Sequence, residues 1–417
     1  MLFLISLLFC LPYQSWGGAY NIMQYGAKGD GITDDTTAFE EAWQKLCNDG
    51  EPGSSLTIPS NNTFLVGPIK FQGPCRSTGI HFEISGTIVA PENPNSFHGC
   101  GTGAWLYFAN LTGLTVNGGG TIDGRGKAWW TRFSSDDDVI DTGAPLSAPV
   151  GGATLIEEEL RCSIPPTALH FENCNSLQLR YLSHRDSPRN HIGLSRSSNS
   201  VISNLDIAAP ANSPNTDGID IATSTQVQIH NLVIKTGDDC IAINNGASQV
   251  NITYVNCGPG HGIRINYWKF GRKQPLRDVE GIYVKHCNFT ETQNGARIKS
   301  WQGGSGYARD ITFEHIGLYK VFNPIIIDQH YCPHNKNCPP ESTAVNISNI
   351  HYKFFQGTSA SKVAINFDCS NKIPCSGISL DQINIMSFVK GESTTAKCNN
   401  AYGIVSSTEP NVTCLSH

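Results

Sequence analysis

The sequence has few charged side chains and no excess of basic ones. Of its 417 residues, 15% are Asp, Glu, Lys or Arg, and 35 acidic residues outnumber 29 basic ones, which gives a formal net charge of −6. Proteins that bind nucleic acid normally present a strongly basic surface. The composition therefore argues against nucleic acid as a partner, and an acidic ligand would need a local cluster of basic side chains.

Patterns typical of long helices are also scarce. The one strong amphipathic stretch, "DDTTAFEEAWQKLC", lies near the N-terminus. Asp35 or Thr36 is a plausible N-cap for this predicted helix. Phe39, Trp43 and Leu46 share one of its faces. Glycine is abundant by contrast, at 41 residues, which indicates many short strands joined by turns.

An apolar stretch opens the chain in "MLFLISLLFCLPYQSWGGAY". A short apolar core followed by small residues is typical of a secretory signal peptide, so we expect removal of residues 1–18 and a mature domain of residues 19–417. The alternative is a buried N-terminal strand. Because the stretch is too short for a comfortable membrane span, we expect a secreted, extracellular protein with no membrane attachment after cleavage. Six sequons would permit N-glycosylation, at Asn61, Asn110, Asn251, Asn288, Asn346 and Asn411.

Cysteine usage agrees with secretion. One of the 15 cysteines lies in the predicted signal peptide, and the other 14 are an even number, as is typical of disulfide-bonded proteins. The pairs expected from closeness in sequence are Cys332–Cys338, Cys369–Cys375, Cys398–Cys414 and Cys240–Cys257. The segment "HYCPHNKNC" could be mistaken for a zinc site, but a local disulfide is the favoured interpretation in a secreted chain.

A repeating pattern of short strands and turns fills most of the chain. The intervals from Gly218 to Cys240 and from Cys240 to Gly262 are both 22 residues. A constant repeat of this length predicts an all-β fold, a single-stranded right-handed parallel β-helix capped by the short N-terminal helix. An antiparallel sandwich is the alternative, but its strands would not return in parallel register. The first strands of successive units are expected to start at Ala168, His191, Gly218, Cys240, Gly262 and Gly295.

The repeat places acidic residues above one another. Asp217, Asp239 and His261 are 22 residues apart, and each immediately precedes the first strand of its unit. Since stacked strands lie about 4.8 Å apart, these side chains should form a ladder on one surface, with Asp238 beside Asp239. Mutual repulsion should raise the pKa of at least one carboxyl group. An acid and a base carboxylate together are the equipment of glycoside hydrolysis.

The next unit adds positive charge to the same face. In "GARIKSW", Ile298 should point inward, and Arg297 and Lys299 outward. Cations beside carboxylates suit a sugar that itself carries a carboxylate. Asp is frequent in β-helix turns for structural reasons, but three carboxylates in register with His, Arg and Lys favour a functional site. The equivalent outward positions of earlier units are Asp220, Ala242 and Arg264.

At these residues the sequence resembles the polygalacturonase-type glycoside hydrolases of family 28, and most of all a plant member. It carries "NTD" at 215–217, "DD" at 238–239, "GHG" at 260–262 and "RIK" at 297–299, in the order and approximate spacing of that family. "YGAKGDGITDD" and, at 324–331, "PIIIDQHY" are also similar. The resemblance covers essentially the whole mature chain and implies a pectin lyase-like β-helix.

The resemblance implies how the acidic ladder would work. Asp238 would be the general acid, and Asp217 and Asp239 would together activate the hydrolytic water. His261 would support the protonation state and geometry of the acid. The family inverts the anomeric carbon and needs no metal or other cofactor. Inverting enzymes usually hold their carboxyl groups roughly 6.5–9.5 Å apart; the ladder predicts a smaller separation, and the family is understood to be an exception.

The resemblance also implies how substrate would be held. Arg297 and Lys299 would bind substrate carboxylates, Tyr331 would position the sugar at the cleaved bond, and Asn215 would line the same site. The implied partner is an acidic polysaccharide, homogalacturonan. A β-helix of this length can bury its own core, so a monomer is expected.

One segment departs from the family pattern. After "GHGI" the family commonly has a small polar residue, whereas this chain continues "RINYWKFGRKQPLRD". Arg264 thus stands one unit before Arg297, and two guanidiniums at strand spacing repel unless an anion lies nearby. Asp220 or an extra substrate carboxylate could supply that anion. We expect Arg264 to bind substrate and residues 266–277 to reshape a subsite; a solvated basic loop is the alternative.

Four functions are compatible with these motifs. The favoured one is a secreted polygalacturonase, with endo or exo action undecided. A related hydrolase of rhamnogalacturonan or xylogalacturonan is the second. The third, a pectate lyase, would use Ca²⁺ and an Arg base, and the ladder histidine argues against it. The fourth is a pectin-binding β-helix without activity, which only the altered segment after "GHGI" supports.

Overall fold

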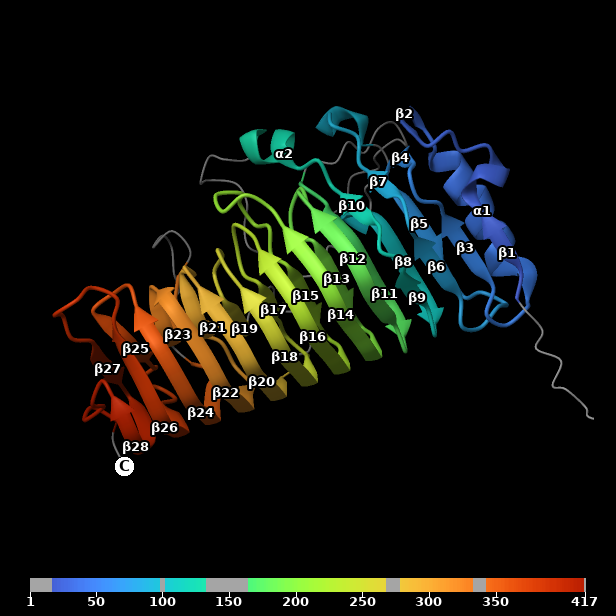
Figure 1. Cartoon of the computed structure of the whole chain (residues 1–417). Helices are drawn as coiled ribbons and strands as arrows, with labels where there is room; N and C mark the ends of the chain where they lie inside the picture. Colours follow the sequence, from blue (N-terminus) through green and yellow to red (C-terminus); the bar gives the residue numbers. More distant parts are fainter. Residues whose placement is uncertain (1–16, 98–101, 133–163, 268–277, 333–342, 416–417) are drawn as a thin grey trace, which may run out of the picture.

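The computed structural model describes residues 17–97, 102–132, 164–267, 278–332 and 343–415. In this part of the chain the strands form a coil whose successive turns stack along one axis, from the N-terminal end to the C-terminal end (Figure 1). The strands make two sheets, of 17 and 11 strands, and every strand pair is parallel. The predicted all-β parallel β-helix is confirmed.

The 11-stranded sheet forms the wall that carries the predicted site. Its strands in spatial order are β5 (Ile69–Gln72), β8 (Ala104–Thr112), β11 (Thr167–Asn175), β13 (Ile192–Ser195), β15 (Ile219–Ala222), β17 (Ile241–Ile243), β19 (Ile263–Tyr267), β21 (Asn294–Trp301), β23 (Asn323–Tyr331), β25 (Val363–Asp368) and β27 (Thr395–Asn399). The register aligns Leu169, Ile192, Ile219, Ile241, Ile263 and Ala296. Because each follows an expected unit start by one residue, the repeat alignment is confirmed.

The 17-stranded sheet forms the rest of the coil. Its early strands are short: β1 (Ala19–Asn21), β2 (Asp30–Asp34), β3 (Ser55–Ile58), β4 (Thr63–Leu65), β6 (His81–Ile84), β7 (Thr87–Val89), β9 (Thr115–Asn117) and β10 (Thr121–Asp123). Its later strands are long: β12 (Gln178–Arg185), β14 (Ser198–Ala208), β16 (Thr225–Lys235), β18 (Ser248–Cys257), β20 (Val279–Thr290), β22 (Tyr307–Val321), β24 (Asn346–Ser359), β26 (Cys375–Ser387) and β28 (Ala401–Glu409).

Each long strand corresponds to two short strands joined at a bend. The first half of β12 pairs with β9 and its second half pairs with β10. Between the halves lies Tyr181, with φ at 55° in the left-handed region. The same position of the following strands is also left-handed, at Asn204, Asn231, Tyr254, His286, His315, Phe354, Gln382 and Ser407. This column of bends turns the chain once per coil.

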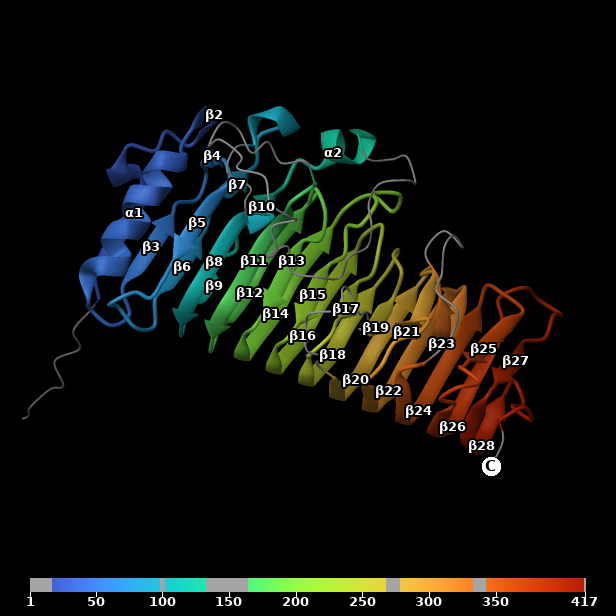
Figure 2. The same cartoon turned by 180° about the vertical axis from the view of Figure 1, so that it is seen from behind.

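The helix α1 (Thr36–Asp49) lies across the N-terminal end of the coil, as Figure 2 also shows from behind. Phe39, Trp43 and Leu46 are buried against the core, as predicted. Asp35 occupies the N-cap position, but its carboxylate makes no cap bond and instead accepts hydrogen bonds from the preceding loop. The remaining helical segments are short: η1 (Ile22–Tyr25), η2 (Pro94–Ser96) and α2 (Lys127–Arg132).

Three of the four expected disulfides are confirmed. The described disulfides are Cys47–Cys75, Cys240–Cys257, Cys369–Cys375 and Cys398–Cys414. Cys332 is also disulfide-bonded, and Cys338 lies outside the described residues. Cys174 and Cys287 are buried free thiols, so the even count does not translate into complete pairing.

The expectations about secretion concern residues that the structure covers only in part. Residues 1–16 of the predicted signal peptide lie outside the described residues. Within the described chain, we find no helix with the length and apolar character that crossing a membrane requires. The asparagines of all six sequons are exposed, which leaves each accessible for glycosylation.

Candidate active site

The acidic ladder lies in the turns that lead from strands of the 17-stranded sheet into strands of the 11-stranded sheet. Each member of the ladder lies two residues before a strand: Asp217 before β15, Asp239 before β17 and His261 before β19. A single Gly or Cys residue separates it from the strand. The backbone N–H of Gly218 donates to the carbonyl of Asp239 at 2.9 Å, and the strands that follow are in register. The predicted stacking of the three residues is therefore confirmed.

Short polar side chains fix these turns to one another. The hydroxyl of Thr216 accepts a hydrogen bond from the N–H of Gly237 at 3.0 Å, so the turn before Asp217 is bound to the turn before Asp238. The side chain of Asn294 donates to the carbonyl of His261 at 3.1 Å. Sequence reasoning did not single out Thr216 or Asn294, although Thr216 stands inside the "NTD" motif.

A glycine is required next to the histidine of the ladder. Gly262 has φ of 89°, in the left-handed region, and a Cβ added there would lie 2.1 Å from the carbonyl oxygen of Asn294. No L-amino-acid side chain fits such a space without moving the backbone. The glycine thus lets the turn carrying His261 pack directly on the next rung.

Asp238 and His261 form the more exposed half of the ladder. Nδ1 of His261 lies 3.0 Å from Oδ1 of Asp238, which also accepts a hydrogen bond from the N–H of Asp239 at 2.8 Å. Burial disfavours the imidazolium, but the hydrogen bond to Asp238 and the charges of Asp238 and Asp239 outweigh it and raise the pKa of His261. Their side chains are 24% and 34% exposed, so both can meet a ligand.

Asp217 and Asp239 form the buried half. Burial raises the pKa of Asp217 well above its usual range, and the neighbouring carboxylates of Asp238, Asp220 and Asp239 raise it further. Burial also raises the pKa of Asp239, where Arg264 opposes the effect. Oδ1 of Asp239 is buried without a hydrogen-bond partner among the described residues. The two groups expected to activate water therefore lie in a site that disfavours their charge.

Arg264 meets this buried pair. Its Nη2 lies 3.3 Å from Oδ2 of Asp217, and its Nε contacts Oδ2 of Asp239. The register confirms the predicted outward column of Asp220, Ala242, Arg264 and Arg297. The expected anion for Arg264 was Asp220 or substrate; the carboxylates of Asp217 and Asp239 are two further anions that sequence reasoning did not name. In the segment after Arg264 that differs from the family pattern, residues 268–277 lie outside the described residues.

The predicted cations gather on the next rung. Ile298 points into the core, and Arg297 and Lys299 lie on the outer side of β21, as predicted. Nζ of Lys299 lies 4.0 Å from the ring centroid of Tyr331, and the guanidinium carbon of Arg297 lies 5.6 Å from it. Strand β23 thus brings Tyr331 to both cations. Asn215, half-buried, occupies a left-handed turn position two residues before Asp217.

Comparison with known proteins identifies the family. A model of glycosyl hydrolases family 28 matches residues 47–143 and 152–409. The chain belongs to this family. It is 40% identical to a polygalacturonase of Persea americana over 91% of this chain and 76% of the relative, and 37% identical to a polygalacturonase of Prunus persica over 99% and 98%. This family 28 glycoside hydrolase is thus polygalacturonase-like, and pectin is its substrate class.

Solved structures agree on the fold. The endo-xylogalacturonan hydrolase of Aspergillus tubingensis superposes with a TM-score of 0.73 at 19% identity, over 96% of this chain and all of that one. At this identity the likeness shows the fold alone. The fold of this chain is therefore also that of a solved hydrolase.

One group of side chains in this family 28 hydrolase could converge on a metal ion among the described residues. Asp238, Asp239 and His261 each offer a ligand atom within 4.8 Å of the others. However, Nδ1 of His261 already meets Asp238, and Asp239 already meets the guanidinium of Arg264. These candidate ligands are thus already in contact with basic side chains or with one another, and we assign no metal to them.

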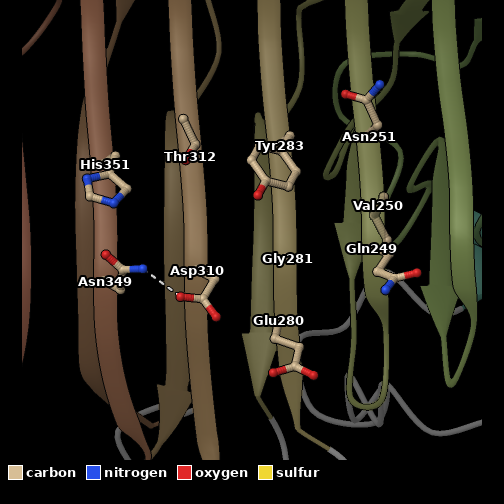
Figure 3. Close-up of a pocket in the computed structure, with 10 residues that line it drawn as sticks. All are labelled: Gln249, Val250, Asn251, Glu280, Gly281, Tyr283, Asp310, Thr312, Asn349 and His351. Atoms are coloured by element: carbon tan, nitrogen blue, oxygen red, sulfur yellow. Dashed lines mark hydrogen bonds between the residues drawn. The ribbon is translucent and has the colours of Figure 1, made fainter.

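A pocket on the other wall does not suit an acidic ligand. It lies across β18, β20, β22 and β24, where Figure 3 shows Tyr283, Asp310 and Asn349 along its surface. The side chain of Asn349 donates to Asp310 at 2.6 Å. Glu280 and Asp310 are the charged groups among its lining residues, with no Lys or Arg. An acidic polysaccharide is better matched by the ladder face.

Proposed function

We propose that this family 28 hydrolase is a secreted polygalacturonase that cleaves the α-1,4-galacturonosidic bonds of homogalacturonan with inversion. The observation that carries the proposal is the meeting of acid and cation on one face. On this face Asp239, with Asp238 beside it, lies two rungs and Asp217 three rungs from Arg297 and Lys299, and His261 lies on the rung between. Hydrolysis needs the carboxylates, and an anionic sugar needs the cations.

The exposures support separate roles for the carboxylates. Asp238, the most exposed of the three, is proposed as the general acid that protonates the leaving oxygen. His261 holds its Oδ1 and carries positive charge readily because its pKa is raised. Asp217 and Asp239 lie deeper and are proposed to activate the water that attacks from the opposite face of the sugar. Attack from that face inverts the anomeric carbon.

The cations and the ring of Tyr331 support the binding of a uronic acid. Lys299 is only 4% exposed and its ammonium group lies against the ring of Tyr331, so the position of the charge is fixed. A fixed cation gives a charge-assisted hydrogen bond to a substrate carboxylate. Tyr331 offers an apolar ring surface beside it, and Asn215 is proposed to line the acidic side of the same site.

Product analysis on de-esterified polygalacturonic acid tests the proposal. We expect saturated reducing ends from the wild type and their loss in Asp238→Asn, with about a 10²- to 10⁴-fold fall in kcat. Asp310→Asn, on the other wall, is the matched control and should remain active. Unsaturated ends would point to a lyase and contradict the proposal. Proton NMR of the first product anomer would check inversion.

Secretion is supported by the disulfides, which persist in oxidising compartments, and by the exposure of the sequon asparagines. A monomer is the proposed state. The second candidate function is binding of pectin without cleavage. One observation favours it, namely that Arg264 contacts both carboxylates that should activate water. Binding to polygalacturonate without products from the folded wild type would establish it.

A further inference from the structure

Arg264 reaches the ladder across two rungs. It stands on β19, the register places Ala242 of β17 beside it, and Asp220 of β15 is the next member of the column. Asp217 belongs to the β15 rung, about 9.6 Å of strand spacing away. Only a long side chain can span that gap, and the small side chain of Ala242 leaves room above the sheet. The guanidinium then contacts carboxylates of two rungs at once.

The guanidinium is buried together with the groups that it contacts. Arg264 is 3% exposed, Asp239 3% and Asp217 8%. Because burial penalises unpaired charge heavily, two buried carboxylates are accommodated at lower cost when one guanidinium contacts both. The fork of the guanidinium, with donors at fixed angles, suits simultaneous contact with two carboxylates better than an ammonium group would.

Other charges around this trio do not replace the guanidinium. The turn before β17 adds Asp238, the turn before β19 adds His261, and β15 adds Asp220. Strand β13 (Ile192–Ser195), on the opposite side, has no charged residue. From β21 come Arg297 and Lys299, which act on Asp239, and from β23 comes Asp328, which faces Arg297. Arg264 contacts both buried carboxylates.

We propose that Arg264 is a positioning residue: its buried guanidinium is the fixed counter-ion that orients Asp217 and Asp239 for water activation and favours their ionised forms against the effect of burial, and it thereby sets the lower pH limit of hydrolysis. The inference rests on the proposed function. It differs from a substrate-binding role, because Arg264 acts through the two carboxylates and is itself covered. An opposite charge at this distance lowers an Asp pKa by about 1–3 units.

The experiment compares the pH dependence of kcat and KM on de-esterified polygalacturonate for the wild type, Arg264→Ser and Arg264→Lys. In Arg264→Ser the acid limb of the profile should move up by about 1–3 pH units while KM changes little. Arg264→Lys keeps the charge but lacks the fork, so its limb should lie between the two. Arg309→Ser, an exposed arginine paired with Glu280, is the matched control and should not move the limb.

An unmoved acid limb would overturn the inference, and an unmoved limb with a raised KM would assign Arg264 to substrate binding. A second readout does not need activity. Without the guanidinium the folded-state pKa values of Asp217 and Asp239 rise, so the variant loses stability as pH increases from about 4 towards 7. The gap in Tm between wild type and Arg264→Ser should widen over that range.

The two readouts separate this inference from the proposed function. A wild type that does not cleave polygalacturonate would refute the function, and the widening Tm gap would still show that Arg264 favours the ionised forms of the two carboxylates. A Tm gap that is constant with pH would show that Arg264 contributes packing alone, and would overturn the inference whatever the activity.

Discussion

Removal of the Cys240–Cys257 disulfide should cost both stability and activity. The bond closes a sequence separation of 17 residues. The chain-entropy relation for a loop of that size gives about 3 kcal/mol at 25 °C. With an unfolding entropy of about 2.1 cal/mol/K per residue over about 400 residues, Tm should fall by about 4 °C. Cys240 is fully buried, so the double change to alanine removes packing as well.

The activity loss follows from where the disulfide lies. Cys240 directly follows Asp239, and Cys257 lies four residues before His261, so the bond joins the two turns that hold the acid and its histidine. A displacement of about 1 Å at a reacting group costs about 100-fold in rate. We therefore expect kcat to fall about 10- to 100-fold at a temperature where the variant remains folded.

The matched control is the Cys398–Cys414 disulfide at the C-terminal end. Its separation of 16 residues gives nearly the same entropic cost, again about 3 kcal/mol, but it lies on β27 and beyond, away from the ladder. Thermal unfolding by circular dichroism and initial rates of reducing-end release would be measured for both double alanine variants. Equal losses of kcat in the two variants, or full activity without Cys240–Cys257, would refute the reasoning.

Two further predictions concern charge. Lys299→Met should lower kcat/KM on polygalacturonate by about 10- to 100-fold, because a charge-assisted bond to the substrate carboxylate is lost; an equal loss on methyl-esterified pectin, measured in parallel, would contradict a role in binding that carboxylate. Burial lowers the pKa of His184 to about 3, so the stability that its neutral form provides is present above about pH 6.5 and is lost as pH falls. His184→Leu should therefore reduce the acid-side slope of unfolding free energy, measured by denaturant titration at several pH values, by about 1.4 kcal/mol per pH unit, and an unchanged slope would refute this.

The repeat predicted the fold because parallel coils convert sequence interval into spatial register. A 22-residue step between Gly218, Cys240 and Gly262 is enough to align three strands, and the structure aligns them. The bends of the long strands were not predictable in the same way. The left-handed column includes Tyr254 and His286, and a bulky residue such as tyrosine ordinarily avoids that region. Stacking between their rings, at 5.2 Å, is a tertiary contact that no local pattern reveals.

The ladder itself was predictable because its members share a position within the repeat. The contacts of Arg264 with Asp217 and Asp239 were not, because the prediction considered only the column that holds Asp220. Sequence register predicts where the Cα atom of Arg264 lies. Its guanidinium lies several bonds from that atom and extends past Ala242 to the neighbouring column of acidic residues. Thr216 was missed because its side chain is short and makes a local contact with the next turn. Nothing in the sequence marks that contact except its place between Asn215 and Asp217.

Fixed rung spacing makes the charges of this face interdependent. Arg264 and Arg297 occupy adjacent rungs of one column, where two guanidiniums alone would repel. The lean of Arg264 toward Asp217 and Asp239 directs its charge to the acidic side and leaves Arg297 beside Lys299 and Tyr331. A small residue at position 264 would remove the repulsion between the two guanidiniums, but it would also remove the guanidinium that contacts Asp217 and Asp239. The buried arginine therefore separates the face into an acidic half suited to chemistry and a basic half suited to an anionic sugar.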